Sequence, residues 1–465
     1  MTSLITSRAR HVAVIGLGAA GLVAVRELRR EGHTVIGFER EKHVGGLWVY
    51  TDRVEPDSLS VDPDRTIVHS SVYQSLRTNL PRECMGYSDF PFVTRSGEGD
   101  PRRYPDHREV LMYLQDFAKE FKIEEMIRFD TEVLCVEPTP ENNRNWSVQF
   151  KSSSGVSGEE IFDAVVVCNG HFTEPRLAHI PGIESWPGKQ IHSHNYRIPD
   201  LFKDQVVIVI GSQASGNDIS KDIATIAKEV HISSKAVASD SYGCYDNLRI
   251  HPTIYRARED GSVVFRNGKV VFADAIVHCT GYKYHFPFLK NNGYVTVEDN
   301  RVGPLYKHVF PPAFAPGISF IGLPFMFFMF EIQSKWVASV LSGRVKLPTE
   351  DKMMEEAIAF YTKLEDLGIP KRYTHFLTDP RGNPMLGTFK PEDAVVISQS
   401  DYFNWIAKQC RCTYIERWRE RLYNVAIKKI FFGGDSYRDQ WDDDQFIEEV
   451  YGEFAKLKSN QDCSS

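Results

Sequence analysis

A glycine-rich hexapeptide near the N-terminus carries the clearest chemical signal in this sequence of 465 residues. It follows the β-branched run HVAVI at 11–15, and its members are Gly16, Leu17, Gly18, Ala19, Ala20 and Gly21. Gly16 permits a tight turn, Gly18 lets a pyrophosphate approach the backbone, and Gly21 lets a helix pack closely on a strand. Glu39 ends the next strand-forming run, where a carboxylate accepts hydrogen bonds from a ribose. These residues predict a dinucleotide site for FAD or NAD.

A second motif of the same kind follows the run VVIVI at 206–210. Its members are Gly211, Ser212, Gln213, Ala214, Ser215 and Gly216. The first and last glycines match the pattern, and Gln213 replaces the middle one. After the next strand Lys235 stands in place of an acid, and a cation can hold a 2′-phosphate that an acid would repel. A lone lysine is often only a solvated surface charge, so the assignment of NADPH depends on its position at the strand end.

Two dinucleotide sites in one chain imply that electrons pass from a nicotinamide to a flavin, which assigns FAD to the first motif. Gly45, Gly46 and Trp48 follow Glu39 closely. A flavin can lie along such a backbone. A surface turn with a half-buried tryptophan explains the same residues equally well.

Composition and cysteine spacing exclude several other classes. The net charge is −7 without a dense basic run, so no nucleic-acid partner is predicted. The eight cysteines contain no CxxC or CxxxxC pair, which disulfide reductases with two nucleotide sites require; Cys410 and Cys412 are the only close pair. No export signal and no apolar stretch of ~20 residues is present. We expect a cytoplasmic enzyme for a small molecule, without a transmembrane anchor or metal ion, and the oligomeric state is open.

Further motifs resemble those of the class B flavin-dependent monooxygenases over nearly the whole chain. The stretch at 186–196, which includes His192, is similar to the family fingerprint FxGxxxHxxxY. The Tyr-Arg pair at its end differs from the Trp-Pro or Trp-Asp of the Baeyer-Villiger branch and favours the N- and S-oxygenating branch. With the stretches at 75–92, 279–282 and 437–443, these motifs look most like the plant glucosinolate S-oxygenase group.

The resemblance implies a reaction and its cofactors. In the family NADPH reduces FAD, NADP stays bound, and the reduced flavin traps O2 as a C4a-hydroperoxide that oxygenates a thioether sulfur. The implied substrate is a methylthioalkyl glucosinolate, and the product is the methylsulfinylalkyl glucosinolate. Ser212 and Lys235 depart from the Asn and Arg that this group carries, so we expect weaker binding of NADPH.

Asn79 is the candidate catalytic residue, because the family motif places it beside the flavin as a hydrogen-bond donor. An asparagine two residues before Pro81 is, by itself, more often a turn residue. His192 and Tyr196, four residues apart, are expected to share one helical face and to organise the NADP domain. The apolar segment at 320–336 either lines the substrate channel or forms a buried strand and helix start.

The predicted fold class is α/β, with two nested Rossmann-like dinucleotide-binding domains. The FAD domain spans 1–170 and 275–465 with a helical C-terminal wrap, and the NADP domain is inserted at 171–274. The strands at 164–170 and 275–281 end alike, in CNG and CTG, which suits a chain that leaves and re-enters one sheet.

Two other functions stay open at this point. An N-oxygenating enzyme or an uncoupled NADPH oxidase would use the same cofactors and release H2O2 with or without a sulfide. A catalytically silent flavin-binding partner protein is the third possibility, and the presence of both glycine motifs and Asn79 argues against it.

Overall fold

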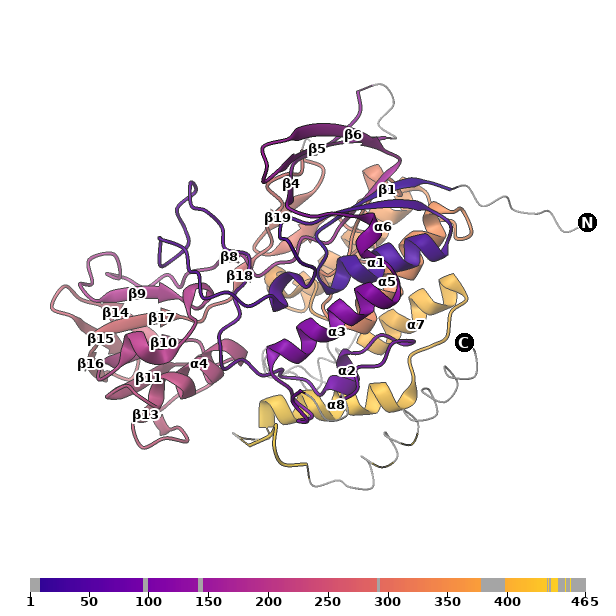
Figure 1. Ribbon diagram of the computed structural model, residues 1–465. Coiled ribbons are helices and arrows are strands. Elements are labelled where there is room, and N and C mark those ends of the chain that lie inside the picture. Colours follow the sequence, from indigo (N-terminus) through magenta and orange to yellow (C-terminus); the bar gives the residue numbers. More distant parts are fainter. Residues whose placement is uncertain are drawn as a thin grey trace, which may run out of the picture.

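The structure, a computed structural model, describes residues 9–94, 99–140, 145–290, 293–377, 398–432, 434, 436–441, 448 and 452. Figure 1 shows two lobes, one containing β1 (His11–Ile15) and α1 (Ala19–Arg30), the other β10 (Val206–Ile210) and α4 (Ala214–Ala224). Each lobe is built around a largely parallel sheet, with a glycine motif between β1 and α1 in the first lobe and between β10 and α4 in the second. The predicted α/β class with two Rossmann-like domains is confirmed.

The first sheet is parallel throughout, in the order β21-β7-β1-β2-β3. Its other strands are β2 (Thr34–Phe38), β3 (Ile127–Arg128), β7 (Ala164–Val167) and β21 (Ile318–Phe320). Alternate residues of a strand point to opposite faces, so Val12 and Val14 pack into the helical core whereas Ala13 and Ile15 face a smaller sheet. That sheet contains β4 (Thr131–Pro138), β5 (Trp146–Ser152) and β6 (Ser157–Phe162). Because β1 is buried on both faces, its sequence is apolar without alternation.

The second sheet repeats this plan in the order β12-β13-β11-β10-β17-β9, with only β12 antiparallel. Its other strands are β9 (Lys189–His192), β11 (Glu229–Ser233), β12 (Ser241–Tyr242), β13 (Leu248–His251) and β17 (Ala275–His278). Val207 and Val209 pack against α4, and Ile208 and Ile210 face a second three-stranded sheet. This sheet contains β14 (Ile254–Ala257), β15 (Ser262–Phe265) and β16 (Val270–Phe272).

The pairing of β17 shows that the predicted start of the returning FAD domain at residue 275 comes too early in the chain. It pairs with β10 and β9, so it belongs to the second sheet. In the first sheet β7 holds the equivalent place beside β1. The similar endings CNG and CTG therefore mark corresponding strands of two sheets, and not the exit from and return to one sheet. A division by sheets puts the return to the first lobe after His278.

The connections between the lobes pair with each other. β8 (Glu174–Pro175) follows β7, β18 (Tyr282–Lys283) follows β17, and the two are antiparallel neighbours. The chain then forms the hairpin of β19 (Thr296–Glu298) and β20 (Arg301–Gly303) before it reaches β21.

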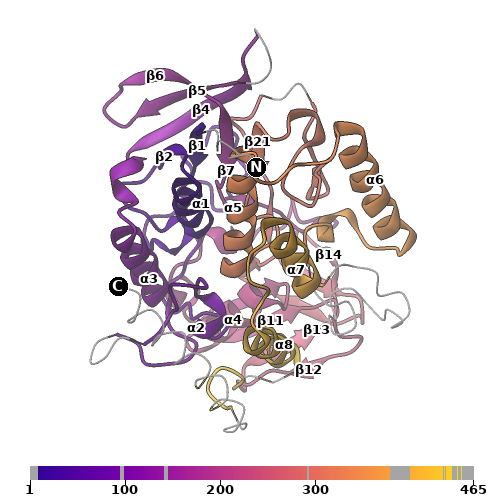
Figure 2. The same ribbon diagram turned by 90° about the vertical axis from the view of Figure 1, so that its right-hand side faces the viewer.

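α1 packs directly on one side of the first sheet, against β1, β2 and β7. The other helices of this lobe are α2 (Arg82–Met85), α3 (His107–Glu120), α5 (Phe327–Leu341), α6 (Glu350–Asp366), α7 (Gln399–Cys410) and α8 (Arg417–Phe432). α5 packs along α1, α7 packs on α5, and α8 packs on α2, as Figure 2 shows from a second direction. The described part of the C-terminal region therefore covers the helical side of the first lobe.

Candidate functional site

The first glycine motif forms a tight turn between β1 and α1. Gly16 has a φ of +87° and donates its N–H to the Phe38 carbonyl at 2.9 Å. A Cβ on Gly21 would lie 1.9 Å from the Gly16 carbonyl oxygen. Only glycine therefore lets α1 begin this close to the strand that precedes it.

Glu39 lies directly after β2, at the carboxyl edge of the first sheet. Its carboxylate accepts the N–H of Leu17 at 2.8 Å and the N–H of Glu41 at 2.9 Å. The side chain is buried, and burial raises the pKa of Glu39. This acid is thus held beside the glycine turn, at the edge where open α/β sheets bind ligands.

Two backbone segments without side chains meet at Gly18 and Gly46. Gly46 begins a short 3-10 helix, η1 (Gly46–Trp48), and a Cβ on it would lie 2.9 Å from the Gly18 Cα. Trp48 packs against the helical core. Gly18 has an ordinary extended backbone, with φ −77° and ψ −165°, so a glycine here provides space and not a special conformation. Such a bare backbone fits a pyrophosphate group.

The N-termini of α1 and α4 differ from those of three other helices. In α3, α6 and α7 the first turn is capped by a side chain, from Asp106, Thr349 and Ser398 respectively. No side chain caps α1 or α4, nor α2 or α5, but only α1 and α4 among these four follow a glycine turn. Helix N–H groups without a cap attract phosphate, which the partial positive charge of the helix end also favours. Both glycine motifs therefore fit nucleotide phosphates.

The second glycine motif repeats the backbone hydrogen bonds and the close glycine contact of the first turn. Gly211 donates its N–H to the Ser233 carbonyl at 2.9 Å, and Cys279 donates to Ile210 at 2.9 Å, as Cys168 does to Ile15 at 2.9 Å. A Cβ on Gly216 would lie 2.0 Å from the Gly211 carbonyl oxygen. Ala214, Ser215 and Gly216 form the first turn of α4, as Ala19, Ala20 and Gly21 do in α1.

The two turns differ in their side chains. Gln213, which is exposed, has φ −89° and ψ −166°, close to the backbone of Gly18. The hydroxyls of Ser212 and Ser234 lie 2.7 Å apart, in the place of the contact between Leu17 and Glu39. Lys235 is exposed, two residues beyond β11. A hydroxyl pair and a cation thus replace the buried carboxylate of the first site.

Asn79 is exposed at a turn between two buried neighbours, Thr78 and Leu80. The Thr78 hydroxyl donates to the Leu80 carbonyl at 2.9 Å, and the Thr78 N–H donates to the Pro105 carbonyl at 2.8 Å. The preceding Leu76 carbonyl accepts the N–H of His107 at 3.1 Å. The His107 ring lies 5.5 Å from that of Tyr50, two residues after η1. The turn with Asn79 is therefore connected to the η1 region of the first site.

His192 and Tyr196 do not share a helical face, so that expectation is wrong. His192 is the last residue of β9, and a 3-10 turn, η3 (Ser193–Asn195), separates it from Tyr196. Their four-residue spacing arises because the chain turns between the lobes. Burial, together with the charges of His194 and His278, lowers the pKa of His192 to about 3, so the ring is neutral.

Arg197 has a role that the sequence motifs did not predict. Arg197 is 5% exposed, and its guanidinium donates five hydrogen bonds of 2.7 to 3.0 Å to backbone carbonyls of two segments, one after η1 and one after β9. The acceptors are Thr51, Arg53, Ser70, His194 and Tyr196. Its position directly after the fingerprint tyrosine was the available signal.

The apolar segment at 320–336 is largely core. Phe320 ends β21, and α5 buries most of its side chains against α1 and α7. Phe325 is the exception, with 39% of its surface exposed. Of the two expectations, a buried strand and helix start describes this segment.

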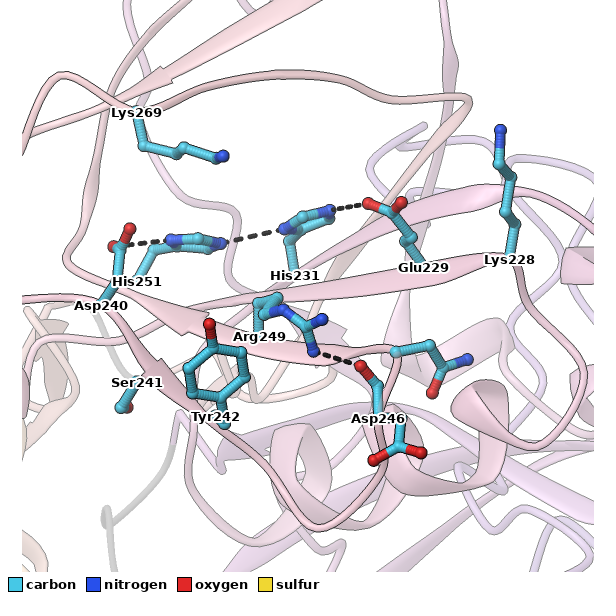
Figure 3. Close-up of a pocket in the computed structure, with 11 residues that line it drawn as sticks. Lys228, Glu229, His231, Asp240, Ser241, Tyr242, Asp246, Arg249, His251 and Lys269 are labelled. Atoms are coloured by element: carbon cyan, nitrogen blue, oxygen red, sulfur yellow. Dashed lines mark hydrogen bonds and ion pairs between the residues drawn. The ribbon is translucent and has the colours of Figure 1, made fainter.

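A surface pocket of about 540 Å³ lies in the second lobe, over the β11 and β13 strands (Figure 3). A row of hydrogen-bonded side chains crosses it. Asp240 contacts His251 at 2.7 Å, the His251 and His231 rings meet at 2.9 Å, and Glu229 lies 3.2 Å from His231. None of the predicted site residues lines this pocket, so it is separate from both glycine motifs.

Within the described ranges, no group of three or more His, Cys, Asp or Glu side chains is arranged to hold a metal ion. In the same part of the chain no helix is both long and apolar enough to cross a membrane.

The fold and the two glycine turns define a protein with two Rossmann-like lobes, and comparison with known proteins identifies its family. The model of the flavin-binding monooxygenase-like family matches residues 9–239 and 243–378. The chain belongs to this family and is a flavin monooxygenase. It is 93% identical over 468 residues to flavin-containing monooxygenase FMO GS-OX-like 1 of Arabidopsis thaliana, with 100% of both chains covered. It is 62% identical over 457 residues to FMO GS-OX5 of the same plant, covering 96% of this chain and 95% of the relative.

A solved structure agrees with this assignment. The S-allyl-L-cysteine S-oxygenase of Allium sativum matches with a TM-score of 0.90 and 51% identity, over 97% of this chain and 100% of the other. The resemblance to class B flavin monooxygenases, and to the plant GS-OX group within them, is thereby confirmed.

Proposed function

We propose that this chain is an NADPH- and FAD-dependent S-oxygenase that converts a methylthioalkyl glucosinolate to the methylsulfinylalkyl glucosinolate. One oxygen atom of O2 forms the sulfoxide. The other leaves as water, formed with the hydride of NADPH, which carries two electrons and one proton, and with one further proton. The observation that carries the proposal is the repeated glycine turn, each with an uncapped helix, in a chain 51% identical to an S-oxygenase.

The residues of the first site suit FAD. The backbone from Gly16 to Gly21 and the N-terminus of α1 would hold the pyrophosphate, and Glu39 would accept ribose hydroxyls. The bare backbone at Gly46 and the ring of Trp48 would border the rest of the cofactor. When bound and reduced, the flavin supplies the chemistry that activates O2.

The second site suits NADPH. The turn from Gly211 to Gly216 and the N-terminus of α4 would hold its pyrophosphate, with Lys235 beside the 2′-phosphate. The exposed position of Lys235 leaves its ammonium group accessible to such a ligand. Ser212, which bonds to Ser234, would add a hydroxyl at the edge of the site.

The protein's own task at the reacting centre is to donate a hydrogen bond and to exclude water. We assign the donor role to Asn79, whose amide is exposed on a turn that two hydrogen bonds of Thr78 hold in place. No acid-base triad is needed, because a thioether sulfur already has the lone pair that accepts the oxygen atom.

The test is a balance of NADPH, O2, sulfoxide and H2O2 measured with the purified holoenzyme. With a methylthioalkyl glucosinolate we expect about one sulfoxide per NADPH; with the methylsulfinyl compound, which has no free thioether, we expect none. Equal H2O2 release in both cases would identify an uncoupled NADPH oxidase. Oxygenation of a tertiary amine in preference to the thioether would identify an N-oxygenase.

The role of Asn79 is tested in the same assay. Asn79→Asp keeps the shape of the side chain but removes the amide donor, so we expect most NADPH to yield H2O2. Gln74→Ala, another exposed residue of the same segment, is the matched control and should keep the wild-type balance. An Asn79→Asp enzyme with an unchanged balance would refute the assignment.

A further inference from the structure

The helix that follows the second glycine motif presents two acids to the segment that leads to Asn79. Asp218 and Asp222 are one turn apart on α4 and share a face. The Tyr73 hydroxyl donates to Asp218 at 3.2 Å, and the Ser75 hydroxyl donates to Asp222 at 2.8 Å. A helix of the second lobe is therefore bonded directly to a segment that precedes α2 of the first lobe, and Tyr73 and Leu76 of this segment also pack in the core of the second lobe.

Each acid has a second partner that fixes its orientation. The hydroxyl of Tyr196, the last residue of the fingerprint, donates to the same Asp222 oxygen at 2.6 Å. Burial and then this hydrogen bond raise the pKa of Tyr196, so it remains a donor. Arg438 binds Asp218 through two parallel hydrogen bonds of 3.0 and 2.7 Å, a geometry stronger than a single bond.

The neighbour of Arg438 continues this pattern on the same segment. Asp439 accepts two hydrogen bonds from Arg77, at 3.1 and 2.8 Å, and the Arg77 Nε donates to the Tyr104 carbonyl at 3.0 Å. Tyr73, Ser75 and Arg77 are thus each held by a carboxylate, at every second residue. The segment ends in the closed turn that displays Asn79.

We propose that Asp218 and Asp222 are positioning residues, which hold the turn with Asn79 at a fixed place relative to the N-terminus of α4. The proposal rests on the proposed function and deepens it. The same helix begins at the predicted NADPH site and carries both acids, so one rigid element connects that site to the predicted hydrogen-bond donor. The acids touch neither nucleotide site in their own right; they act through the segment from Tyr73 to Thr78.

Hydrogen exchange of backbone amides tests the positioning without reference to turnover. The N–H groups of Gln74, Leu76 and Thr78 are all hydrogen-bonded in this segment. In Asp222→Ala we expect them to exchange about tenfold faster than in the wild-type holoenzyme. Asp222→Asn should be close to the wild type, because its amide oxygen can still accept both hydroxyls. Glu355→Gln, which breaks an exposed ion pair on α6, is the control and should leave these rates unchanged.

Turnover provides the second readout. Asp222→Ala should raise the share of NADPH that yields H2O2 several-fold, while the KM for NADPH stays within about twofold because Lys235 and the glycine turn are intact. Ser75→Ala removes only the opposite hydroxyl and should act in the same direction, more weakly. The double variant should release no more H2O2 than Asp222→Ala alone, since both changes break the same contact between Ser75 and Asp222.

Several results would overturn the positioning role. Unchanged exchange at all three amides in Asp222→Ala is one, and faster exchange throughout the second sheet is another, since it would indicate general unfolding. Full additivity of Ser75→Ala and Asp222→Ala would also contradict it. If the wild type forms no sulfoxide, the proposed function fails, yet the exchange rates still decide whether these acids hold the segment.

Discussion

The two glycine turns have the same backbone and different surroundings. Gly16 and Gly211 make the same hydrogen bond to the neighbouring strand, and Gly21 and Gly216 approach the preceding carbonyl equally closely. Yet α1 lies in the core between α5 and the first sheet, with most of its residues buried, whereas α4 buries one face only.

Charge pairs differ in the same way. α1 is joined to α5 by Arg26 and Glu331, whose side chains are 2% and 4% exposed. α4 is joined to the C-terminal region by Asp218 and Arg438, each 14% exposed. The first site is thus part of the core of its lobe, and the second is attached by polar contacts near the surface. Under the proposed function, this difference would suit an FAD that stays bound in the first lobe and an NADPH that exchanges in the second.

The largest expected effect comes from alanine at the last glycine of either motif. In Gly21→Ala and in Gly216→Ala the new Cβ would clash with backbone, so neither helix can start where it does. We expect Gly21→Ala to lose most of its bound flavin, and Gly216→Ala to stay yellow but to lose reduction by NADPH. Flavin absorbance per chain measures the loss of cofactor. A comparison of flavin reduction by dithionite with flavin reduction by NADPH measures the loss of the nicotinamide reaction. Equal flavin loss in the two variants would contradict the comparison.

Removing the buried charge between α1 and α5 should destabilise the first lobe. Glu331→Gln removes the buried carboxylate that Arg26 and the half-buried Lys335 share, which we expect to cost about 3 kcal/mol of unfolding free energy at pH 7. Arg26 keeps its contacts with Glu27 and Asp89. Urea unfolding followed by flavin release measures this loss. Asp401→Asn, at the exposed start of α7, should cost far less.

The buried Glu331 carboxylate also predicts how the unfolding free energy depends on pH. Burial works to raise the pKa of Glu331, but Lys335 and Arg26 outweigh it and lower the pKa to about 2. A carboxylate with a depressed pKa stabilises the fold fully above its unfolded value of 4.5 and loses this effect as the pH falls toward 2. The difference in unfolding free energy between the wild type and Glu331→Gln should therefore be constant above pH 4.5 and shrink below it. A difference that grows on acidification would contradict this.

A smaller effect is expected at the cation of the second site. Lys235→Ala should raise the KM for NADPH about tenfold, or ~1.4 kcal/mol, with little change in kcat or in the KM for NADH. Lys235→Arg should restore or improve NADPH binding, because the guanidinium holds a phosphate by two bonds. Steady-state kinetics with both nucleotides measure these effects. An unchanged KM for NADPH in Lys235→Ala would show that Lys235 is only a solvated surface charge.

The smallest effect is expected at Gln213, the residue that breaks the second motif. Its backbone matches that of Gly18, so Gln213→Ala should change the KM for NADPH less than about twofold. Gly18→Ala, at the equivalent place beside Gly46, should reduce flavin content measurably. If Gln213→Ala were the more harmful of the two, the side chain of Gln213 would itself contact the nucleotide.

Much of the fold was predictable because its units are local. Each glycine motif stands between an apolar run and an amphipathic stretch. Glu39 follows the next strand directly, and Lys235 lies two residues beyond its strand. Such strand-turn-helix units depend on residues close in sequence. The placement of β17 was not predictable from its own apolar pattern, which suits either sheet equally well.

The sequence by itself determined that two nucleotide folds are present, which residues form their turns, and which family they resemble. Tertiary structure alone decided that Gly18 meets Gly46, that Arg197 binds the Ser70 carbonyl, and that Tyr73 reaches Asp218 across 145 residues. The reason is physical: short-range patterns select backbone conformation, whereas the partner of a polar side chain depends on how separate elements pack.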